Sequence, residues 1–333
     1  MQAGFRAFRI YAQQVFERAA IESLRLADLS AGDVIIKVHY SSVNYKDALA
    51  GSGRGKILRQ SPLVGGIDLA GEVVSSSHPV FSAGQLVLVN GSGLSETHDG
   101  GYSEYARVPS DWVVTMPDGL QPRTAMLIGT AGFTAGLAIQ RLLDNHQTPE
   151  QGPILVTGAS GGVGSYAIQL LHQLGFEVIA LTRKTDAHDY LTGLGASQVL
   201  AVEQLKQDDA QLHKGLWAGA IDNLGGTVLA SLTKSVKPWG NIVSVGMAAS
   251  VDIKTSTLPF ILRGISLLGV SSANCPQSLR KKIWQQLGAQ WRPQKLAQVC
   301  AGEVGLDDLP EVFEKLLTAD VRGRYLVKLL AED

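Results

Sequence analysis

The chain has 333 residues, and its 29 basic and 30 acidic side chains leave a formal net charge of −1. A balanced charge without a long run of Lys or Arg argues against a nucleic-acid partner or an anionic membrane surface, and the longest apolar stretches fall short of the roughly 20 residues that cross a bilayer. The length and a hydrophobic fraction of 45% predict a globular protein of two domains.

Two cysteines, Cys275 and Cys300, are present. So few cysteines exclude a disulfide framework and are typical of a reducing compartment, and we interpret both as ordinary buried thiols. Residues 1–11 carry two arginines among single apolar residues, without the apolar core or cleavage site of a secretory signal. We therefore expect a cytoplasmic protein.

The first 120 or so residues read as mainly β structure. Apolar and polar residues alternate over residues 33–40, which is the period of a half-buried strand, so we expect an antiparallel region to begin there. Short strand-like runs separated by Gly, Pro and Ser recur at 71–75, 86–90 and 105–108.

After Pro122 the pattern changes to alternating helices and strands. Residues 125–143 predict a helix, and the alternation that follows predicts a parallel sheet of five or six strands in a doubly wound fold. The expected strands are 154–157, 178–181, 198–201, 219–222, 241–245 and an edge strand at 265–270. The tail predicts helices near 279–291 and 309–318 and a strand at 325–330 that returns to the first domain.

A glycine-rich turn runs from Thr157 to Gly164, between a buried strand and a helix. In this context Gly161 lets the backbone approach a pyrophosphate, Gly164 lets the helix pack on the strand, and the helix N-terminus presents N–H groups to negative charge. The turn therefore predicts a dinucleotide site, although Ala159 stands where the commoner pattern has its first glycine.

Residues 158–162 also match the G-x-S-x-G elbow of α/β-hydrolases, which would make Ser160 a nucleophile. That fold needs a catalytic histidine late in the chain, but the last histidine is His213. We therefore interpret Ser160 as a phosphate-loop residue.

The end of the second strand indicates which dinucleotide binds. NAD sites usually place an acid there for the ribose hydroxyl, whereas NADP sites place cations for the 2′-phosphate. This chain has Thr182, Arg183 and Lys184, and its nearest acid is Asp186. The pattern favours NADPH, with an exposed pair of surface cations as the alternative.

A metal site is not predicted. The two cysteines are far apart, and the seven histidines show no i, i+4 pair of the kind that binds zinc. No P-loop string is present either.

With these features in place, the chain resembles the medium-chain dehydrogenase/reductases, in particular their zinc-free, quinone-oxidoreductase-like members. The segments that carry the resemblance are 44–47 (Asn-Tyr-Lys-Asp), 66–71 (Gly-Ile-Asp-Leu-Ala-Gly), 129–135, 157–164 and 259–263. They are most similar to the acrylyl-CoA reductase (NADPH) branch. Zinc-dependent relatives have Cys at the Asn44 position and His-Glu at Ile67-Asp68, so the resemblance implies metal-free chemistry.

The resemblance implies an α/β fold with a GroES-like β-barrel catalytic domain at 1–125, a Rossmann cofactor domain with a doubly wound parallel sheet at 126–272, and a return to the catalytic domain at 273–333. Two departures from the family pattern are Gly65, where proline is usual, and Arg183, where glycine is common. The cofactor contacts carried over are Tyr45, Ser160, Gly161, Gly162, Val163, Thr182, Arg183, Lys184, Met247, Ile261, Ser272 and Arg324.

The activity implied is hydride transfer from NADPH to the β-carbon of acrylyl-CoA, giving propanoyl-CoA. Tyr45 is the candidate donor to the thioester oxygen or acid for the α-carbon, with packing on the nicotinamide as the alternative role, and Lys46 or Asp47 could orient it. Reduction of a quinone or a general enone, and NADPH binding without turnover, stay open. A homodimer through the apolar edge strand 265–270 is also expected.

Overall fold

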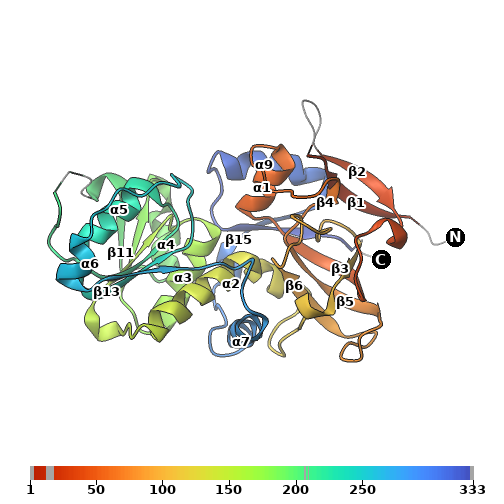
Figure 1. The fold of residues 1–333 in the computed structure, drawn as a ribbon, viewed down its shortest axis with the longest axis horizontal. Helices are drawn as coiled ribbons and strands as arrows, with labels where there is room; N and C mark the ends of the chain where they lie inside the picture. The colour runs from red at the N-terminus through yellow and green to blue at the C-terminus, as the bar shows by residue number, and fades with distance from the viewer. Residues whose placement is uncertain (1–3, 13–18, 206–207, 209, 331–333) are drawn as a thin grey trace. The chain divides into compact units, whose positions relative to one another are not determined.

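The computed structural model describes residues 4–12, 19–205, 208 and 210–330. The chain forms two compact units: unit 1 comprises Met1–Thr130, Ala273–Ala289 and Val299–Asp333, and unit 2 comprises Ala131–Ser272 and Gln290–Gln298. Figure 1 shows that unit 1 is built from both ends of the chain, since its elements carry the red and the blue ends of the colour scale.

Unit 1 contains a seven-stranded sheet in which the order is β15-β16-β3-β5-β6-β8, with β7 paired to β3. The alternation predicted for residues 33–40 is present, since Val34, Ile36 and Val38 are fully buried. The strands are β3 (Val34–Ser42), β5 (Asp68–Ser76), β6 (Leu86–Asn90), β7 (Tyr105–Val108), β8 (Val114–Thr115), β15 (Cys300–Val304) and β16 (Arg324–Lys328).

The antiparallel structure begins earlier than predicted. A second sheet of unit 1 has the order β2-β1-β4, formed by β1 (Phe5–Ile10), β2 (Ala19–Leu24) and β4 (Leu63–Val64). The pattern of β1 is hard to see in the sequence because Arg6 and Arg9 interrupt its buried Phe5, Phe8 and Ile10.

The C-terminal tail completes unit 1, as expected. Strand β16 pairs antiparallel with β3, and α9 (Leu309–Leu317) buries Leu309, Val312 and Phe313. A Cβ on Gly51, in α1 (Tyr45–Ser52), would lie 2.2 Å from the Phe313 ring, so α1 and α9 approach closely. Helix α7 (Gln277–Gly288) also belongs to this unit, and the short α8 (Leu296–Val299) joins unit 2 to β15.

Unit 2 contains the predicted parallel sheet. Its strand order is β11-β10-β9-β12-β13-β14, which in chain order reads 3-2-1-4-5-6, the arrangement of dinucleotide-binding folds. The strands are β9 (Ile154–Thr157), β10 (Val178–Thr182), β11 (Gln198–Ala201), β12 (Trp217–Asp222), β13 (Val236–Ser244) and β14 (Ser266–Gly269). Its helices include α3 (Gly162–Gln173), α4 (His188–Leu194), α5 (Gly226–Ser235) and α6 (Leu258–Arg263).

Helix α2 (Pro122–Asp144) runs from unit 1 into unit 2 and is not continuous. Gly129 interrupts it with φ 50° and ψ −160°, a conformation that disfavours any residue with a Cβ. Contrary to expectation, this helix is long and apolar enough to span a membrane by length and composition. Because 83% of its most apolar window is buried inside the protein, it is a core helix.

Two smaller expectations are corrected. Residues 290–298 pack with unit 2, where Lys295 N donates to Gln169 Oε1 at 2.9 Å and Gln173 Nε2 donates to the Arg292 carbonyl at 3.0 Å. Cys275 and Cys300 are free thiols, as expected, but both are only half-buried.

Candidate functional site

The glycine-rich turn of unit 2 connects β9 directly to α3. Gly158 has φ +56°, and a Cβ on Gly164 would lie 2.6 Å from the Gly158 carbonyl oxygen, so both positions require glycine. A Cβ on Gly161 would have one neighbouring atom within 4 Å, the Gly158 carbonyl oxygen at 3.3 Å. The backbone is therefore open on that side, next to the N–H groups of the first turn of α3, which have no partner within the helix.

Ser160 is part of this turn and is only 6% exposed. Its Oγ is 3.5 Å from Thr182 Oγ1, and among the described residues no histidine is bonded to it. This arrangement lacks the base that a nucleophilic serine needs. It agrees with the interpretation of Ser160 as a phosphate-loop residue.

The cation pair lies beside the turn at the same edge of the sheet. Strands β9 and β10 are parallel neighbours, with Thr157 paired to Leu181, so the residues after each strand emerge together. Thr182 is buried and its Oγ1 accepts from the Lys184 backbone N–H at 3.1 Å, whereas the Arg183 side chain is exposed. The turn thus has a cationic neighbour where an adenosine 2′-phosphate would lie in this fold.

At the point where the strand order reverses, Thr157 of the predicted turn is joined by two polar residues, Asp222 and Asn223, that were not predicted as site residues. Thr157 Oγ1 donates to Asp222 Oδ1 at 2.7 Å, and Asn223 Nδ2 donates to the Thr157 carbonyl at 2.7 Å. Burial raises the pKa of Asp222, and the hydrogen bond from Thr157 opposes that shift. Asn223 Oδ1 is buried and has no partner among the described residues, so an acceptor is available at the switch point. An Asp-Asn pair ending a buried strand was the signal that could have found them.

The remaining cofactor candidates of unit 2 stay predictions. Met247 and Ile261 are large apolar side chains that are 65% and 74% exposed, which leaves them available to a ligand. Ser272 is half-buried at the end of the unit. Gly162 and Val163 form the first turn of α3.

In unit 1, Tyr45 is the first residue of α1 and is 47% exposed. The two neighbours that were expected to orient it face elsewhere. Lys46 forms an ion pair with Glu96, and the Asp47 carboxylate accepts from the Asn44 backbone N–H and from Ile67 N–H, each at 2.9 Å. Neither has a hydrogen bond to the Tyr45 hydroxyl in the described structure, and Asp47 acts on Tyr45 by holding the start of its helix.

Asp47 is fully buried beside a second carboxylate. Burial, followed by the charge of Asp68, raises the pKa of Asp47 to about 7. Its Oδ2 also accepts from Asn44 Nδ2 at 3.1 Å. This carboxyl therefore ties the N-terminus of α1 to the residues just before β5.

Asp68 is the centre of a buried polar network, which we call the Asp68 network. Its carboxylate accepts from Ser42 Oγ at 2.5 Å and from Asn44 Nδ2 at 2.8 Å. It also accepts from the Thr130 backbone N–H at 2.9 Å and the Thr130 hydroxyl at 2.6 Å. The network thereby binds the end of β3 and the start of β5 to the kink in α2.

Arg324, a predicted cofactor contact, also belongs to the Asp68 network. It is 3% exposed, donates to Asn44 Oδ1 at 3.0 Å and to Ser42 Oγ at 2.6 Å, and lies 3.7 Å from Asp68 Oδ2. Its Nε is buried and without a partner among the described residues. Ser42, Asp68 and Thr130 were not predicted as site residues, and only their contacts reveal them.

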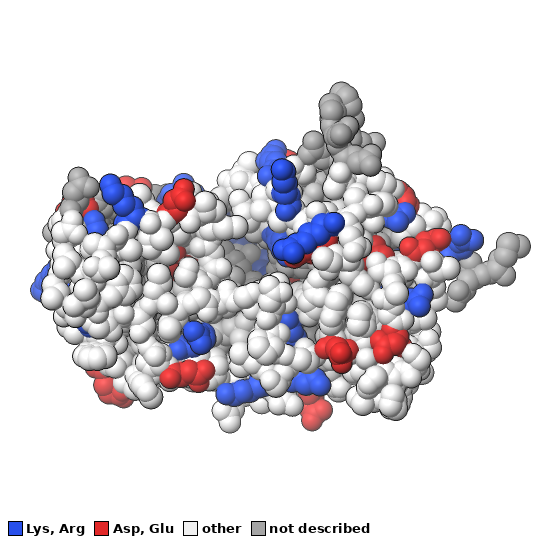
Figure 2. Space-filling model, viewed as in Figure 1, with Lys and Arg blue, Asp and Glu red and all other residues white. Residues whose placement is uncertain are grey.

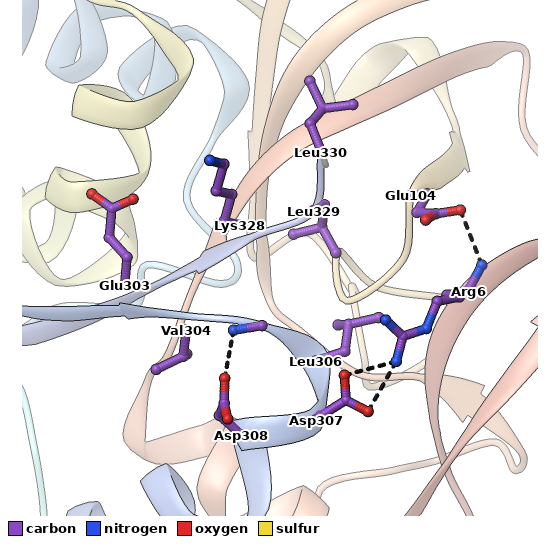
Figure 3. A pocket seen from close by; sticks show the side chains of 11 residues that line it. Arg6, Glu104, Glu303, Val304, Leu306, Asp307, Asp308, Lys328, Leu329 and Leu330 are labelled. Atoms are coloured by element: carbon purple, nitrogen blue, oxygen red, sulfur yellow. Dashed lines mark hydrogen bonds and ion pairs between the residues drawn. The ribbon is translucent and has the colours of Figure 1, made fainter. Parts of the chain in front are cut away.

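A cavity of about 490 Å³ in unit 1 lies apart from these candidates. Figure 3 shows Arg6 directed at Asp307, with hydrogen bonds of 2.9 and 2.8 Å, and Glu104 bonded to the Arg6 backbone. Its lining has two cations and four acids, and no predicted site residue lines it. The lining residues are Arg6, Glu104, Glu303, Val304, Gly305, Leu306, Asp307, Asp308, Lys328, Leu329 and Leu330.

Within the described part of the chain, no group of three or more His, Cys, Asp or Glu side chains could hold a metal ion. Metal-free chemistry stays a prediction from the sequence.

Comparisons with known proteins match this architecture. Residues 30–118 match the alcohol dehydrogenase GroES-like domain family, and residues 162–288 match the zinc-binding dehydrogenase family. The probable acrylyl-CoA reductase AcuI of Escherichia coli is 45% identical over 311 residues, covering 93% of this chain and 95% of that protein. The chain belongs to the medium-chain dehydrogenase/reductase family. The resemblance stated from the sequence is confirmed, as is the fold of a GroES-like domain with a Rossmann domain.

Two further relatives are informative. The yhdH oxidoreductase of Salmonella enterica, in complex with NADP, is 43% identical with a TM-score of 0.93, covering 99% of this chain and 100% of that one. The putative quinone oxidoreductase YhfP of Bacillus subtilis is 42% identical over 93% of this chain and 94% of that protein. Its structure, with NAD bound, has a TM-score of 0.95 and 40% identity, covering 98% and 100%.

Proposed function

We propose that this protein is an NADPH-dependent reductase of the carbon–carbon double bond of a short α,β-unsaturated acyl-CoA, converting acrylyl-CoA to propanoyl-CoA. The observation that carries the cofactor assignment is the glycine-rich turn with Arg183 and Lys184 at the adjoining strand end. The acceptor is supported by the relative named as a probable acrylyl-CoA reductase, at 45% identity.

The residues of unit 2 fit a dinucleotide with an additional phosphate. The open side of Gly161 and the N-terminus of α3 suit the pyrophosphate, because a helix N-terminus favours negative charge. Arg183 and Lys184 would hold the 2′-phosphate, and Asn223 Oδ1 offers an acceptor at the switch point. The NADP-bound relative supports this choice, and the NAD-bound relative makes NADH the alternative to test.

The chemistry needs a hydride, which NADPH supplies to the β-carbon, and a proton, which must reach the α-carbon. Negative charge builds on the thioester oxygen between these events and requires a hydrogen-bond donor. Tyr45 is half-exposed at a helix start that Asp47 holds in place. We assign its hydroxyl the role of hydrogen-bond donor to the thioester oxygen or of proton donor to the α-carbon. Packing against the nicotinamide is its alternative role.

Steady-state kinetics test the acceptor. Acrylyl-CoA and benzoquinone are compared at matched concentrations with saturating NADPH, and kcat/KM is expected to be greater for acrylyl-CoA. A greater kcat/KM for benzoquinone would overturn the proposal in favour of quinone reduction, the second candidate, which the name of the 42% identical YhfP relative supports. Tight NADPH binding without reduction of any activated alkene would instead indicate a non-catalytic binding protein.

We also propose a cytoplasmic homodimer. Strand β14 lies at the edge of the sheet of unit 2, and its Leu267 is 38% exposed. Nearby in the chain, Leu262 is 63% exposed on α6, and an apolar edge of this kind commonly pairs with a second copy.

A further inference from the structure

The segment that follows α1 carries a concentration of positive charge. Arg54, Lys56 and Arg59 are all exposed, and we call them the cationic segment. Lys46, on α1 itself, adds a fourth cation, and the acids in ion-pair contact with this group are Glu96 and Glu314. Four cations against two acids leave a surplus of positive charge. Figure 2 shows Lys and Arg side chains over α1 and α9.

The backbone of the segment is held in place. Gly53 N–H donates to the Ala50 carbonyl at 3.1 Å, and Gly55 N–H donates to the Leu49 carbonyl at 3.1 Å, so the chain folds back on the end of α1. Arg59 N–H donates to the Glu96 carbonyl at 2.7 Å. Ile57 and Leu58 pack against the core of unit 1 between the exposed cations. A ligand would therefore meet charges carried on an ordered backbone, which reduces the part of the entropy cost of binding that comes from ordering a loop.

The existing ion pairs of the segment leave it able to bind an anion. Arg59 Nε lies 3.0 Å from Glu96, but its side chain is 74% exposed. Arg54 and Glu314 lie 2.8 Å apart, and their side chains are 54% and 52% exposed. Exposed pairs contribute little free energy, so a phosphate can replace the carboxylate. Lys56 has no ion-pair partner among the described residues.

The position of the segment relates it to Tyr45. Tyr45 begins α1 and the cationic segment follows its end, and a helix of eight residues is about 12 Å long. An acyl-CoA likewise carries its reacting thioester at one end of a long arm and its phosphates at the other. A quinone has no such charges.

We propose that Arg54, Lys56 and Arg59 bind the phosphate groups of the coenzyme A nucleotide while the acyl group lies at Tyr45. This assignment rests on the proposed acyl-CoA reductase function. It makes the cationic segment the element that distinguishes a coenzyme A thioester from an uncharged enone, because Arg and Lys pair strongly with phosphate oxygens.

The test compares Lys56→Ala, Arg59→Ala and the double variant on two substrates. Acrylyl-CoA carries the phosphates, and acrylyl-N-acetylcysteamine is the same thioester without the nucleotide. Each single variant is expected to raise KM for acrylyl-CoA about fivefold at low salt, the order of one charge-assisted contact, and to leave kcat within about twofold. KM for the truncated thioester should not change. The effect should shrink at high salt, because exposed charges are screened.

Lys37→Ala is the matched control, since Lys37 is an exposed lysine of the same unit on β3; it should leave both KM values unchanged. An equal rise in KM on both substrates, or no rise on acrylyl-CoA, would overturn the proposed phosphate site.

Calorimetric titration with free coenzyme A tests that site without turnover, and Lys56→Ala should weaken the binding of coenzyme A. A wild-type protein that binds free coenzyme A but reduces neither thioester would refute the proposed function and leave the phosphate site standing; absence of coenzyme A binding would refute the site.

Discussion

Asp47 shows how one buried carboxyl can make stability depend on pH. Its folded-state pKa is raised from 3.8 to about 7, with burial as the first cause and the Asp68 charge as the second. Because the folded state favours the protonated form, the stabilising contribution is complete below the unfolded pKa and is lost as pH rises through about 7. The shift corresponds to a penalty of at most about 4 kcal/mol at high pH.

We therefore expect the free energy of unfolding of the wild type to decrease between pH 5 and pH 8. Asp47→Asn removes this ionisation, so the free energy of unfolding of the variant should depend less on pH than that of the wild type. The variant should be less stable than the wild type at pH 5 by about 1–3 kcal/mol, because one amide oxygen cannot accept all three N–H groups. Urea unfolding at each pH unit measures both. Parallel curves for the two proteins would contradict the assignment of this dependence to Asp47.

Arg183 and Lys184 provide a second test on single side chains. If they bind the 2′-phosphate, the double variant Arg183→Ala, Lys184→Ala should raise KM for NADPH by about tenfold or more, the order of one to two charge-assisted contacts. KM for NADH, which lacks that phosphate, should change little and serves as the internal control. Equal changes for both cofactors would mean that the pair acts on structure, and a wild-type preference for NADH would overturn the cofactor proposal.

At the scale of elements, the kink of α2 depends on a single glycine. A Cβ on Gly129 would lie 2.5 Å from Arg324 Nη2 and 2.9 Å from Asp68 Oδ2, in a conformation with φ +50°. We expect Gly129→Ala to destabilise the protein by about 2–4 kcal/mol through strain and disruption of the Asp68 network. Gly193→Ala is the matched control, because Gly193 is helical and its nearest neighbour would be 3.6 Å away. Equal free energies of unfolding for the two variants, measured with urea, would exclude this role for the kink.

The elements that the sequence predicted best are short apolar strands bounded by turns. Strand β9 has the predicted bounds, because a buried parallel strand is a continuous apolar run between clear breaks. The edge strand β11 also has the predicted bounds, although it is only partly buried. Helix α1 was missed: it has eight residues, Gly51 lies inside it and Gly53 follows it, so it shows little helical periodicity. The break in α2 was also missed, since Gly129 lies within a run of good helix formers and only its tertiary contacts reveal the kink.

The residues of the candidate site likewise fall into those that the sequence predicted and those that it could not. The turn and the cation pair are local patterns, and the sequence predicted both. The Asp68 network joins residues that are far apart in the chain, since Asn44 lies 24 residues from Asp68, Thr130 lies 62 residues away, and Arg324 lies 280 residues from Asn44. No local periodicity can predict that these four side chains meet, because the contact depends on the folding of the tail against β3.

At the scale of the whole molecule, the unpaired side of β14 predicts assembly. Strand β14 pairs with β13 alone among the described strands, and an open apolar edge is a template for association with another chain. Light scattering after size exclusion should therefore give twice the chain mass of 35.4 kDa for the wild type. Leu267→Lys places a charge on this edge and should shift the protein toward the monomer mass while the chain keeps the circular dichroism of the folded protein. Val80→Lys, at an apolar residue of unit 1 that is 63% exposed, is the control and should leave the mass unchanged. A wild type of monomer mass would refute the dimer, and a Leu267→Lys dimer of undiminished affinity would place the interface on another surface.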